Sequence, residues 1–160
     1  MSRGYFEVGI VHGKAEVNVG TLWRTAQQLG AAGVFTVGRR YDRQASDVLK
    51  SWRHVPVRNY ADIDDLVAHL PMDCVLVGIE MGGKPLRSFS HPERAVYLLG
   101  AEDHGLSPES VARCKHLVTL ESVVRGSYNV AVAGSIVLYD RCHGPLTERA
   151  RRSEPKEGTP

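Results

Sequence analysis

The chain has 160 residues and a formal net charge of +2, with 42% hydrophobic and 24% charged residues. This balance predicts one globular domain and excludes a largely disordered chain, and no apolar run is long enough to cross a membrane. The N-terminus lacks the apolar core of a signal peptide, so we expect the protein in the cytoplasm. The three cysteines have no paired spacing and are expected to be reduced thiols.

The N-terminal part of the chain predicts a strand, a helix and a second strand, at residues 5–11, 18–30 and 33–37. The helix has one apolar stripe, formed by Leu22, Ala26 and Leu29. Asn18 is a candidate N-cap, and Gly30 is a candidate for the residue that ends the helix. Arg24 lies away from the stripe, where a lone arginine is usually a solvated charge.

A basic and aromatic segment follows the second strand. Its members are Arg39, Arg40, Tyr41, Arg43, Lys50, Trp52, Arg53 and Arg58. Basic side chains neutralise phosphates, and aromatic rings stack on unpaired bases. The segment is therefore either a surface for RNA or an ordinary solvated face, and the small net charge means that any nucleic-acid affinity is local.

The rest of the chain alternates apolar strands with helices. Strands are predicted at 55–57, 74–79, 95–99 and 117–120, and helices at 62–70, 108–114 and 130–139. Pro108 suits a first helical turn, and Asn129 is a candidate N-cap for the last helix, which is apolar almost all round and is expected to be enclosed by protein.

This alternation predicts an α/β fold with a mostly parallel sheet flanked by helices. One domain is expected over residues 1–145. The segment 146–160 is charged, lacks apolar anchors and is expected to be a disordered tail.

Two chemical motifs are incomplete. The run Gly78–Lys84 has the spacing of a phosphate-binding loop, but Pro85 replaces the hydroxyl residue that binds magnesium. Cys114 and His116 are near neighbours without a second pair at ligand spacing, so no metal is expected. The sequence therefore disfavours a nucleotide triphosphatase and a metalloprotein.

Three loops remain as the candidate site: Asn18-x-Gly20-x-x-x-Arg24, Gly100-x-Glu102-x-x-Gly105-Leu106, and Ser127-Tyr128-Asn129 entering the last helix. Two of them follow strands at their carboxyl ends, where open α/β sheets bind ligands. Glycines there allow the backbone to approach a ligand closely. Taken alone, the third loop is equally consistent with an ordinary strand–cap–helix joint.

In this order and with these spacings, the three loops resemble the sequence motifs of the SpoU-type ribose 2′-O-methyltransferases of the SPOUT superfamily. The resemblance covers about residues 5–141. It implies a deep trefoil knot in the C-terminal part of the domain and a homodimer that shares its active site between subunits. It also implies S-adenosylmethionine bound in a bent shape by the knotted loops.

The resemblance assigns roles to individual residues. Arg24 resembles the catalytic arginine, Asn18 the residue that positions it, and Glu102 the glutamate of the second motif. Ser127 and Asn129 resemble the pair near the methyl donor and the target ribose. The positions whose backbone surrounds the adenosine are Ile79, Gly100, Leu120 and Tyr128.

The segment before Ser127 departs from the family pattern. Family members commonly carry Ile-Pro-Met there, whereas this chain has Thr119-Leu-Glu-Ser-Val-Val. Thr119 is therefore an alternative to Leu120 at the cofactor, and Glu121 stands where an apolar residue is usual.

The resemblance implies methyl transfer to a ribose 2′-hydroxyl of RNA. tRNA is favoured over rRNA, with the wobble nucleotide of the anticodon loop as one candidate, because the chain resembles the minimal members of the family. Two alternatives stay open: an rRNA 2′-O-methyltransferase, and a non-catalytic RNA-binding or cofactor-sensing protein on the same fold.

Overall fold

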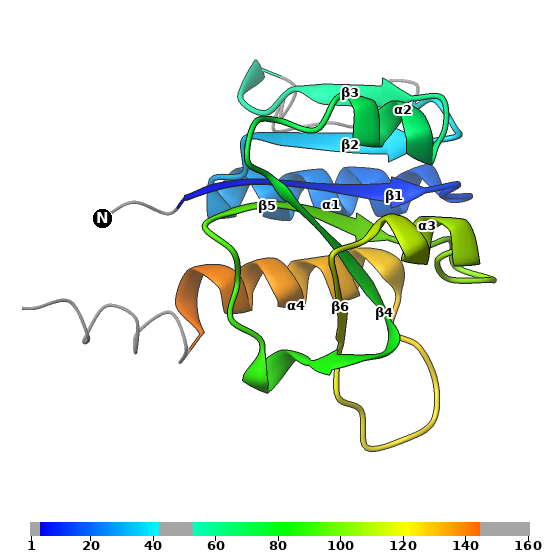
Figure 1. The fold of residues 1–160 in the computed structure, drawn as a ribbon, viewed down its shortest axis with the longest axis vertical. Helices are drawn as coiled ribbons and strands as arrows, with labels where there is room; N and C mark the ends of the chain where they lie inside the picture. Colours follow the sequence, from blue (N-terminus) through cyan, green and yellow to red (C-terminus); the bar gives the residue numbers. More distant parts are fainter. Residues whose placement is uncertain (1–3, 42–52, 145–160) are drawn as a thin grey trace, which may run out of the picture.

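The computed structural model describes residues 4–41 and 53–144, and Figure 1 shows how their elements are arranged. Six strands form one sheet in the order β3-β2-β1-β5-β4-β6, and every neighbouring pair is parallel. The strands are β1 (Tyr5–Val11), β2 (Gly33–Val37), β3 (Val57–Tyr60), β4 (Val75–Pro85), β5 (Arg94–Leu99) and β6 (His116–Thr119). The central strands are apolar on both sides because helices cover both faces of the sheet.

The helices form two layers. α1 (Glu16–Leu29) and α4 (Val130–His143) share one core with the sheet, while α2 (Ile63–Ala68) and α3 (Pro108–Arg113) pack over the opposite face. α1 and α4 lie side by side, with the hydroxyls of Thr25 and Ser135 2.9 Å apart (Figure 1). The predicted α/β fold with a mostly parallel sheet flanked by helices is confirmed.

Several predicted helix ends are confirmed by their local geometry. Asn129 caps α4, because its Oδ1 accepts from the backbone N–H groups of Ala131 and Val132 at 3.0 and 3.2 Å. Ser107 caps α3, and Pro108 occupies its first turn. Gly30 ends α1 with φ of 78°, a left-handed conformation that favours glycine.

The expectation that Asn18 caps α1 is wrong. The helix begins at Glu16, after Ala15, which has extended backbone angles and no capping side-chain bond. Asn18 lies in the first turn instead, where its side chain bonds to Glu102 and Asn129. The side-chain amide of Asn18 therefore forms tertiary hydrogen bonds and does not cap the helix.

Two further corrections concern strands. The strand expected at 55–57 is β3, which begins at Val57 and pairs with β2. β4 continues past Ile79 to Pro85, because both Ile79 and Lys84 align with Val118 of β6 across a shift in register. The run Gly78–Lys84, which has the spacing of a phosphate-binding loop, therefore lies within strand β4. The segment after it contains a 3₁₀ turn, η2 (Leu86–Ser88).

The last helix is not enclosed on all sides. α4 buries one face against α1 and the sheet, but Val132, Ile136 and Tyr139 are 46%, 37% and 62% exposed. These three side chains follow a spacing of four and three residues and form one stripe on the outer face of the helix. The chain itself leaves this apolar stripe exposed.

Some predictions lie beyond the described ranges. Arg43, Lys50 and Trp52, and the tail 146–160, are outside the described residues. Within 4–41 and 53–144 no helix combines the length and apolarity needed to cross a bilayer. The trefoil knot stays a prediction.

Candidate active site

A cavity of about 760 Å³ opens beside residues 79–81 in the middle of β4 and at the carboxyl ends of β5 and β6. Its walls come from the middle of β4, from the loop that follows β5, and from the loop between β6 and α4. This is the edge at which parallel α/β sheets bind ligands, and the volume lies in the range of small-molecule sites. Seven of the predicted site residues line it: Ile79, Gly100, Glu102, Leu120, Ser127, Tyr128 and Asn129.

Asn18, Glu102 and Asn129, which we call the amide–carboxylate cluster, join the three loops at the edge of this cavity. Asn18 Nδ2 donates to Glu102 Oε1 at 2.6 Å, and Asn129 Nδ2 donates to Asn18 Oδ1 at 3.0 Å. Asn18 is 7% exposed, so its amide has little access to water. One residue from each predicted motif therefore meets in one bonded group.

The direction of these bonds is determined by α4. Asn129 uses its oxygen to cap the helix, so only its Nδ2 is available to Asn18. Asn18 then accepts with its oxygen and must offer its nitrogen to Glu102. The cluster has a single consistent arrangement of donors and acceptors, which holds the carboxylate in one orientation.

The carboxylate of Glu102 has several donors. Lys14 donates to Oε2 through its backbone N–H at 3.1 Å, and Lys14 Nζ forms an ion pair with the neighbouring Asp103. Burial raises the pKa of Glu102, but hydrogen bonds from the backbone N–H groups of Glu102 and Lys14 and from the Asn18 amide outweigh it. The pKa is therefore held below its usual value, and the group is ionised at neutral pH.

The residues predicted to surround the adenosine lie along the cavity wall. Ile79 ends the buried part of β4, and Gly100 directly follows β5. A Cβ at Gly100 would lie 2.1 Å from the carbonyl carbon of Gly105, so only glycine fits this turn. Thr119 and Leu120 both line the cavity, so the two alternatives for the cofactor wall stay open.

Glu80 is a cavity residue that the sequence reasoning missed. Its Oε2 accepts from the backbone N–H of Leu106 at 2.6 Å, and its Oε1 accepts from the N–H of Met81 at 2.8 Å. Glu80 thereby ties the middle of β4 to the loop after β5. The available signal was a carboxylate directly after the buried run 76–79.

Arg24 does not line the cavity. It lies on the exposed face of α1 in a stripe with Val17, Thr21 and Gln28. Arg125, in the loop before α4, is the arginine that this chain itself presents to the cavity. The structure therefore brings together all the predicted polar residues except Arg24, with Asn18 joined through hydrogen bonds.

The departure at Glu121 has a local explanation. Its carboxylate forms an ion pair with Arg87 Nε at 3.2 Å, and its carbonyl accepts from the hydroxyl of Tyr128 at 2.9 Å. These contacts fasten the exposed loop before α4 to η2 on one side and to its own end on the other. The charged side chain of Glu121 therefore bonds outside the cavity, and neighbouring residues of the loop form the cavity wall.

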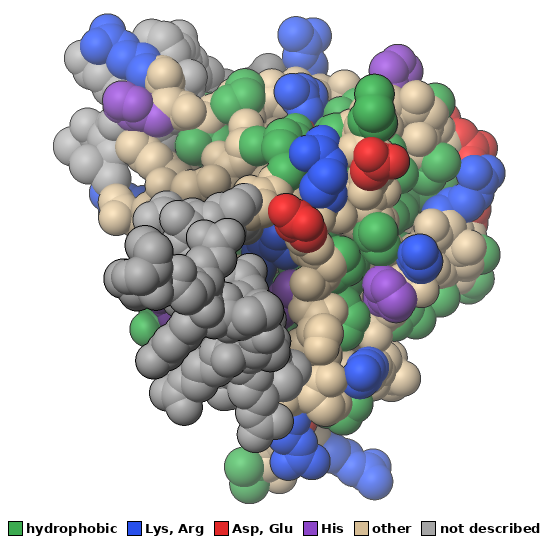
Figure 2. All heavy atoms as spheres, turned by 60° about the vertical axis from the view of Figure 1, so that its left-hand side comes forward, with side chains coloured by type: hydrophobic (Ala, Val, Ile, Leu, Met, Phe, Trp, Pro, Cys, Tyr) green, Lys and Arg blue, Asp and Glu red, His purple; other side chains and the backbone are tan. Residues whose placement is uncertain are grey.

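The basic segment is only partly available for ligands. Arg58 pairs with the buried carboxylate of Glu7 at 2.5 Å, and burial raises the pKa of Tyr5 beside it. Arg39 bonds to backbone carbonyls. On the face shown in Figure 2, described Lys and Arg side chains are spread over the surface rather than gathered into one patch.

Within 4–41 and 53–144, no group of three or more acidic, His or Cys side chains could hold a metal ion.

The comparison with known families agrees with this geometry. The sequence model of the SpoU rRNA methylase family matches residues 6–139. The chain belongs to the SpoU rRNA methylase family. The match includes the candidate residues of the cavity and of α1, and runs through most of α4.

Known proteins resemble this chain at moderate identity. An uncharacterized tRNA/rRNA methyltransferase of Archaeoglobus fulgidus is 27% identical over 128 residues, which make up 76% of this chain and 57% of that protein. This chain therefore spans little more than half the length of that relative.

Two solved structures share the fold. One, from a study of the 2-OH methylation of C/U34 on tRNA, has a TM-score of 0.78 at 23% identity and covers 92% of this chain and 99% of its own. The other is an AdoMet-bound rRNA methyltransferase from Sinorhizobium meliloti, with a TM-score of 0.77 at 25% identity. The match covers 86% of this chain and 56% of the Sinorhizobium meliloti chain.

Proposed function

We propose that this SpoU methylase transfers a methyl group from S-adenosylmethionine to a ribose 2′-hydroxyl of RNA. The observation that carries the proposal is the amide–carboxylate cluster at the edge of a ligand-sized cavity. Membership of the SpoU family supplies the reaction class.

The cavity suits S-adenosylmethionine. The backbone of Ile79, Gly100, Leu120 and Tyr128 would hold the adenosine, with Thr119 as the alternative to Leu120. Three acidic residues, Glu80, Glu102 and Asp103, line the same cavity and favour a cationic ligand. When bound, the sulfonium supplies an activated methyl group, so the protein needs only to orient the acceptor and help its proton leave.

Ser127 and Asn129 are the proposed groups that orient the ribose; in support, both lie in the loop that enters α4 at the cavity. Arg24 is the proposed group at the 2′-hydroxyl. An arginine stays protonated at neutral pH, so it donates to the hydroxyl oxygen and polarises it. The oxygen–methyl bond forms as the sulfur–methyl bond breaks, and the proton leaves to water or to a phosphate of the RNA.

A homodimer brings Arg24 to the reaction. In a single chain Arg24 is exposed outside the cavity, and the neighbouring stripe of Val132, Ile136 and Tyr139 is uncovered. Apolar stripes of this kind mark contact surfaces. We propose that a second copy packs on α1 and α4 and inserts its own Arg24 beside the cavity, and that α4 threads the trefoil knot that supports the cofactor loops.

tRNA is the favoured substrate, with the wobble nucleotide as the first position to examine. Support comes from the structural neighbour studied for methylation of C/U34 on tRNA, which this chain matches over 99% of that protein's length. rRNA is the second candidate, because the AdoMet-bound neighbour is an rRNA methyltransferase.

The test is a methylation assay with isotope-labelled S-adenosylmethionine and separate tRNA and rRNA pools, followed by mass spectrometry of the nucleosides. We expect labelled 2′-O-methyl nucleosides from tRNA with the parental protein and none with Arg24→Ala. Label in rRNA alone would change the substrate, label on a base would contradict the reaction, and cofactor binding without label in either pool would favour a non-catalytic protein.

A further inference from the structure

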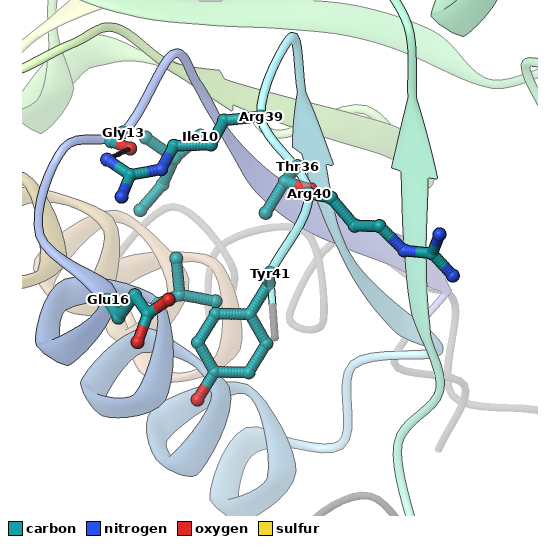
Figure 3. Close-up of a pocket in the computed structure, with 8 residues that line it drawn as sticks. Ile10, Gly13, Glu16, Thr36, Arg39, Arg40 and Tyr41 are labelled. Carbon is teal, nitrogen blue, oxygen red and sulfur yellow. Dashed lines mark hydrogen bonds between the residues drawn. The ribbon is translucent and has the colours of Figure 1, made fainter. Parts of the chain in front are cut away.

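Arg39 reaches from the end of β2 to the turn between β1 and α1. Its NH1 donates to the backbone carbonyl of Lys14 at 2.6 Å. It also donates to the carbonyl of Gly13 at 3.2 Å (Figure 3). A guanidinium that bonds two successive carbonyls restrains the turn more than a single contact would. Arg39 therefore acts on the conformation of residues 13 and 14.

The same turn bonds to the active-site cluster on its other side. Lys14 N–H donates to Glu102 Oε2, and Lys14 Nζ pairs with Asp103. Four residues further along, Asn18 completes the bond to Glu102 Oε1. A continuous set of contacts therefore leads from Arg39 through the turn to the carboxylate and to the Asn18 amide.

The other edge of the Arg39 guanidinium faces solvent. Its side chain is exposed, and within the described residues only NH1 makes hydrogen bonds. Nε and NH2 keep three N–H donors, arranged as the fork that matches two oxygens of a phosphate. Figure 3 shows the neighbouring Arg40 pointing away from the turn, so of these two arginines it is Arg39 that contacts residues 13 and 14.

We propose that Arg39 is a positioning residue that links RNA binding to the amide–carboxylate cluster. One edge of its guanidinium holds the turn at residues 13–14, and the other edge binds a backbone phosphate of the substrate RNA. Phosphate binding fixes the guanidinium, the guanidinium fixes the turn, and the turn holds Glu102 and Asn18 in register. The phosphate part rests on the proposed function, while the contact with the turn does not.

Two simpler roles give different results. If Arg39 only contacts RNA, its loss weakens binding but leaves the rate at saturating RNA unchanged. If Arg39 only stabilises the turn, its loss lowers the rate without altering the salt dependence of RNA binding. The proposal requires both effects.

The experiment compares Arg39→Ala and Arg39→Lys with Arg113→Ala, a matched exposed arginine on α3 that pairs with Asp64 on the other side of the sheet. RNA affinity is measured by fluorescence anisotropy across salt concentrations, and the methylation rate in single turnover at saturating RNA. Arg39→Ala should lower that rate by about tenfold or more, because small misplacements of reacting groups are costly. It should also reduce the salt slope of binding by about 1.

Arg39→Lys separates charge from geometry. It should keep most of the RNA affinity, since one positive charge remains, yet lose most of the rate, since an ammonium cannot hold the carbonyls and a phosphate as a fork. Arg113→Ala should match the parental protein in both measurements. A parental single-turnover rate in Arg39→Ala, or an unchanged salt slope, would overturn the proposal.

A readout without RNA keeps this proposal distinct from the methylation itself. The side-chain amide signal of Asn18 in ¹⁵N NMR should shift in Arg39→Ala and stay in place in Arg113→Ala. If the parental protein methylates no RNA, the proposed function fails, and an unshifted Asn18 signal would then overturn the positioning role independently.

Discussion

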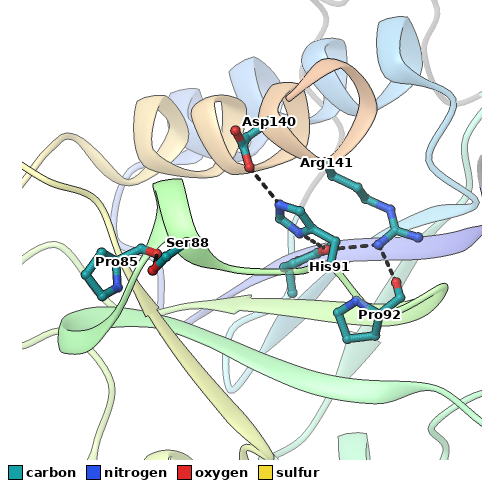
Figure 4. A network of polar contacts seen from close by, with 7 residues as sticks. Pro85, Ser88, His91, Pro92, Asp140 and Arg141 are labelled. Atoms are coloured by element: carbon teal, nitrogen blue, oxygen red, sulfur yellow. Dashed lines mark hydrogen bonds and ion pairs between the residues drawn. The ribbon is translucent and has the colours of Figure 1, made fainter. Parts of the chain in front are cut away.

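Two polar clusters lie at opposite ends of α4, and they differ in access to solvent. At the N-terminal end, Asn129 joins the amide–carboxylate cluster at an open cavity. At the C-terminal end, four residues form what we call the Arg141 cluster: His91, Tyr97, Asp140 and Arg141 (Figure 4). Tyr97 is fully buried and Arg141 is 6% exposed.

The closed cluster contains its own cation, whereas the open one does not. Arg141 donates to the carbonyls of Pro92 and Glu93 at 2.6 and 2.7 Å and to the Tyr97 hydroxyl at 3.0 Å. No guanidinium bonds directly to any of the three side chains of the open cluster within the described ranges. Buried polar groups that form hydrogen bonds within one chain support the fold, whereas polar groups that face a cavity are accessible to a ligand or a partner.

The largest predicted effect is on stability, at the closed cluster. Arg141→Met keeps an apolar side chain but removes the guanidinium that lies over the Phe6 ring and that donates to three acceptors. Leaving buried acceptors unpaired should lower the free energy of unfolding by about 3 kcal/mol. Urea unfolding measures this, and Arg113→Met serves as the exposed control. A loss as small as that of the control would mean that the closed cluster does not stabilise the fold.

Glu102→Gln, at the open cluster, should lower the methylation rate strongly and the free energy of unfolding only slightly. The new amide turns a donor toward either Asn18 Nδ2 or the Lys14 N–H, which disrupts the bonded order. We expect a rate lower by about 10²-fold, with a change of unfolding free energy under about 1 kcal/mol. Glu109→Gln, an exposed change on α3, is the control. Parental activity in Glu102→Gln would remove the cluster from the reaction.

The closed cluster should also give a smaller, pH-dependent effect. Burial lowers the pKa of His91, and the bond to Asp140 offsets this only in part. The unfolded chain therefore binds more protons than the folded one below about pH 6.5, so stability is complete above that pH and falls as pH decreases toward the folded pKa. His91→Gln should flatten this slope of the unfolding free energy, and the exposed His69→Gln should not. Equal slopes in all three proteins would contradict the assignment.

Arg87→Ala should produce the smallest change. The Arg87–Glu121 pair is exposed to solvent, and such pairs contribute about 0.2–1 kcal/mol. Calorimetry should show a loss of S-adenosylmethionine affinity of less than about threefold at low salt, which disappears at high salt. A larger loss would show that this pair, and not the backbone alone, shapes the cofactor wall.

The sequence predicted the parts of the fold that depend on local pattern. Apolar runs such as 95–99 and caps such as Asn129 depend on neighbours in the chain, and both are present. Motif order also brought Glu102 into the same group as Asn18. Spacing alone could not reveal that Asn18 would leave the capping role, because its partner lies 84 residues away.

The contacts that sequence reasoning missed are all tertiary. Glu80 binds a backbone amide 26 residues away, and Arg39 binds carbonyls 25 and 26 residues away. The Arg141 cluster joins residues more than 40 positions apart. The periodicity of the sequence carries no information about such long-range pairs. A lone charged residue therefore gives the same sequence signal whether its side chain is solvated or bonded.

The most direct test of this account is a heterodimer with Arg24→Ala in one subunit and Glu102→Gln in the other, isolated with two affinity tags. If each site combines the cavity of one copy with Arg24 of its partner, one site in the heterodimer is intact. Its 2′-O-methylation rate should then be about half the parental rate, although both variant homodimers are nearly inactive. A heterodimer no more active than either homodimer would contradict an active site shared between two copies.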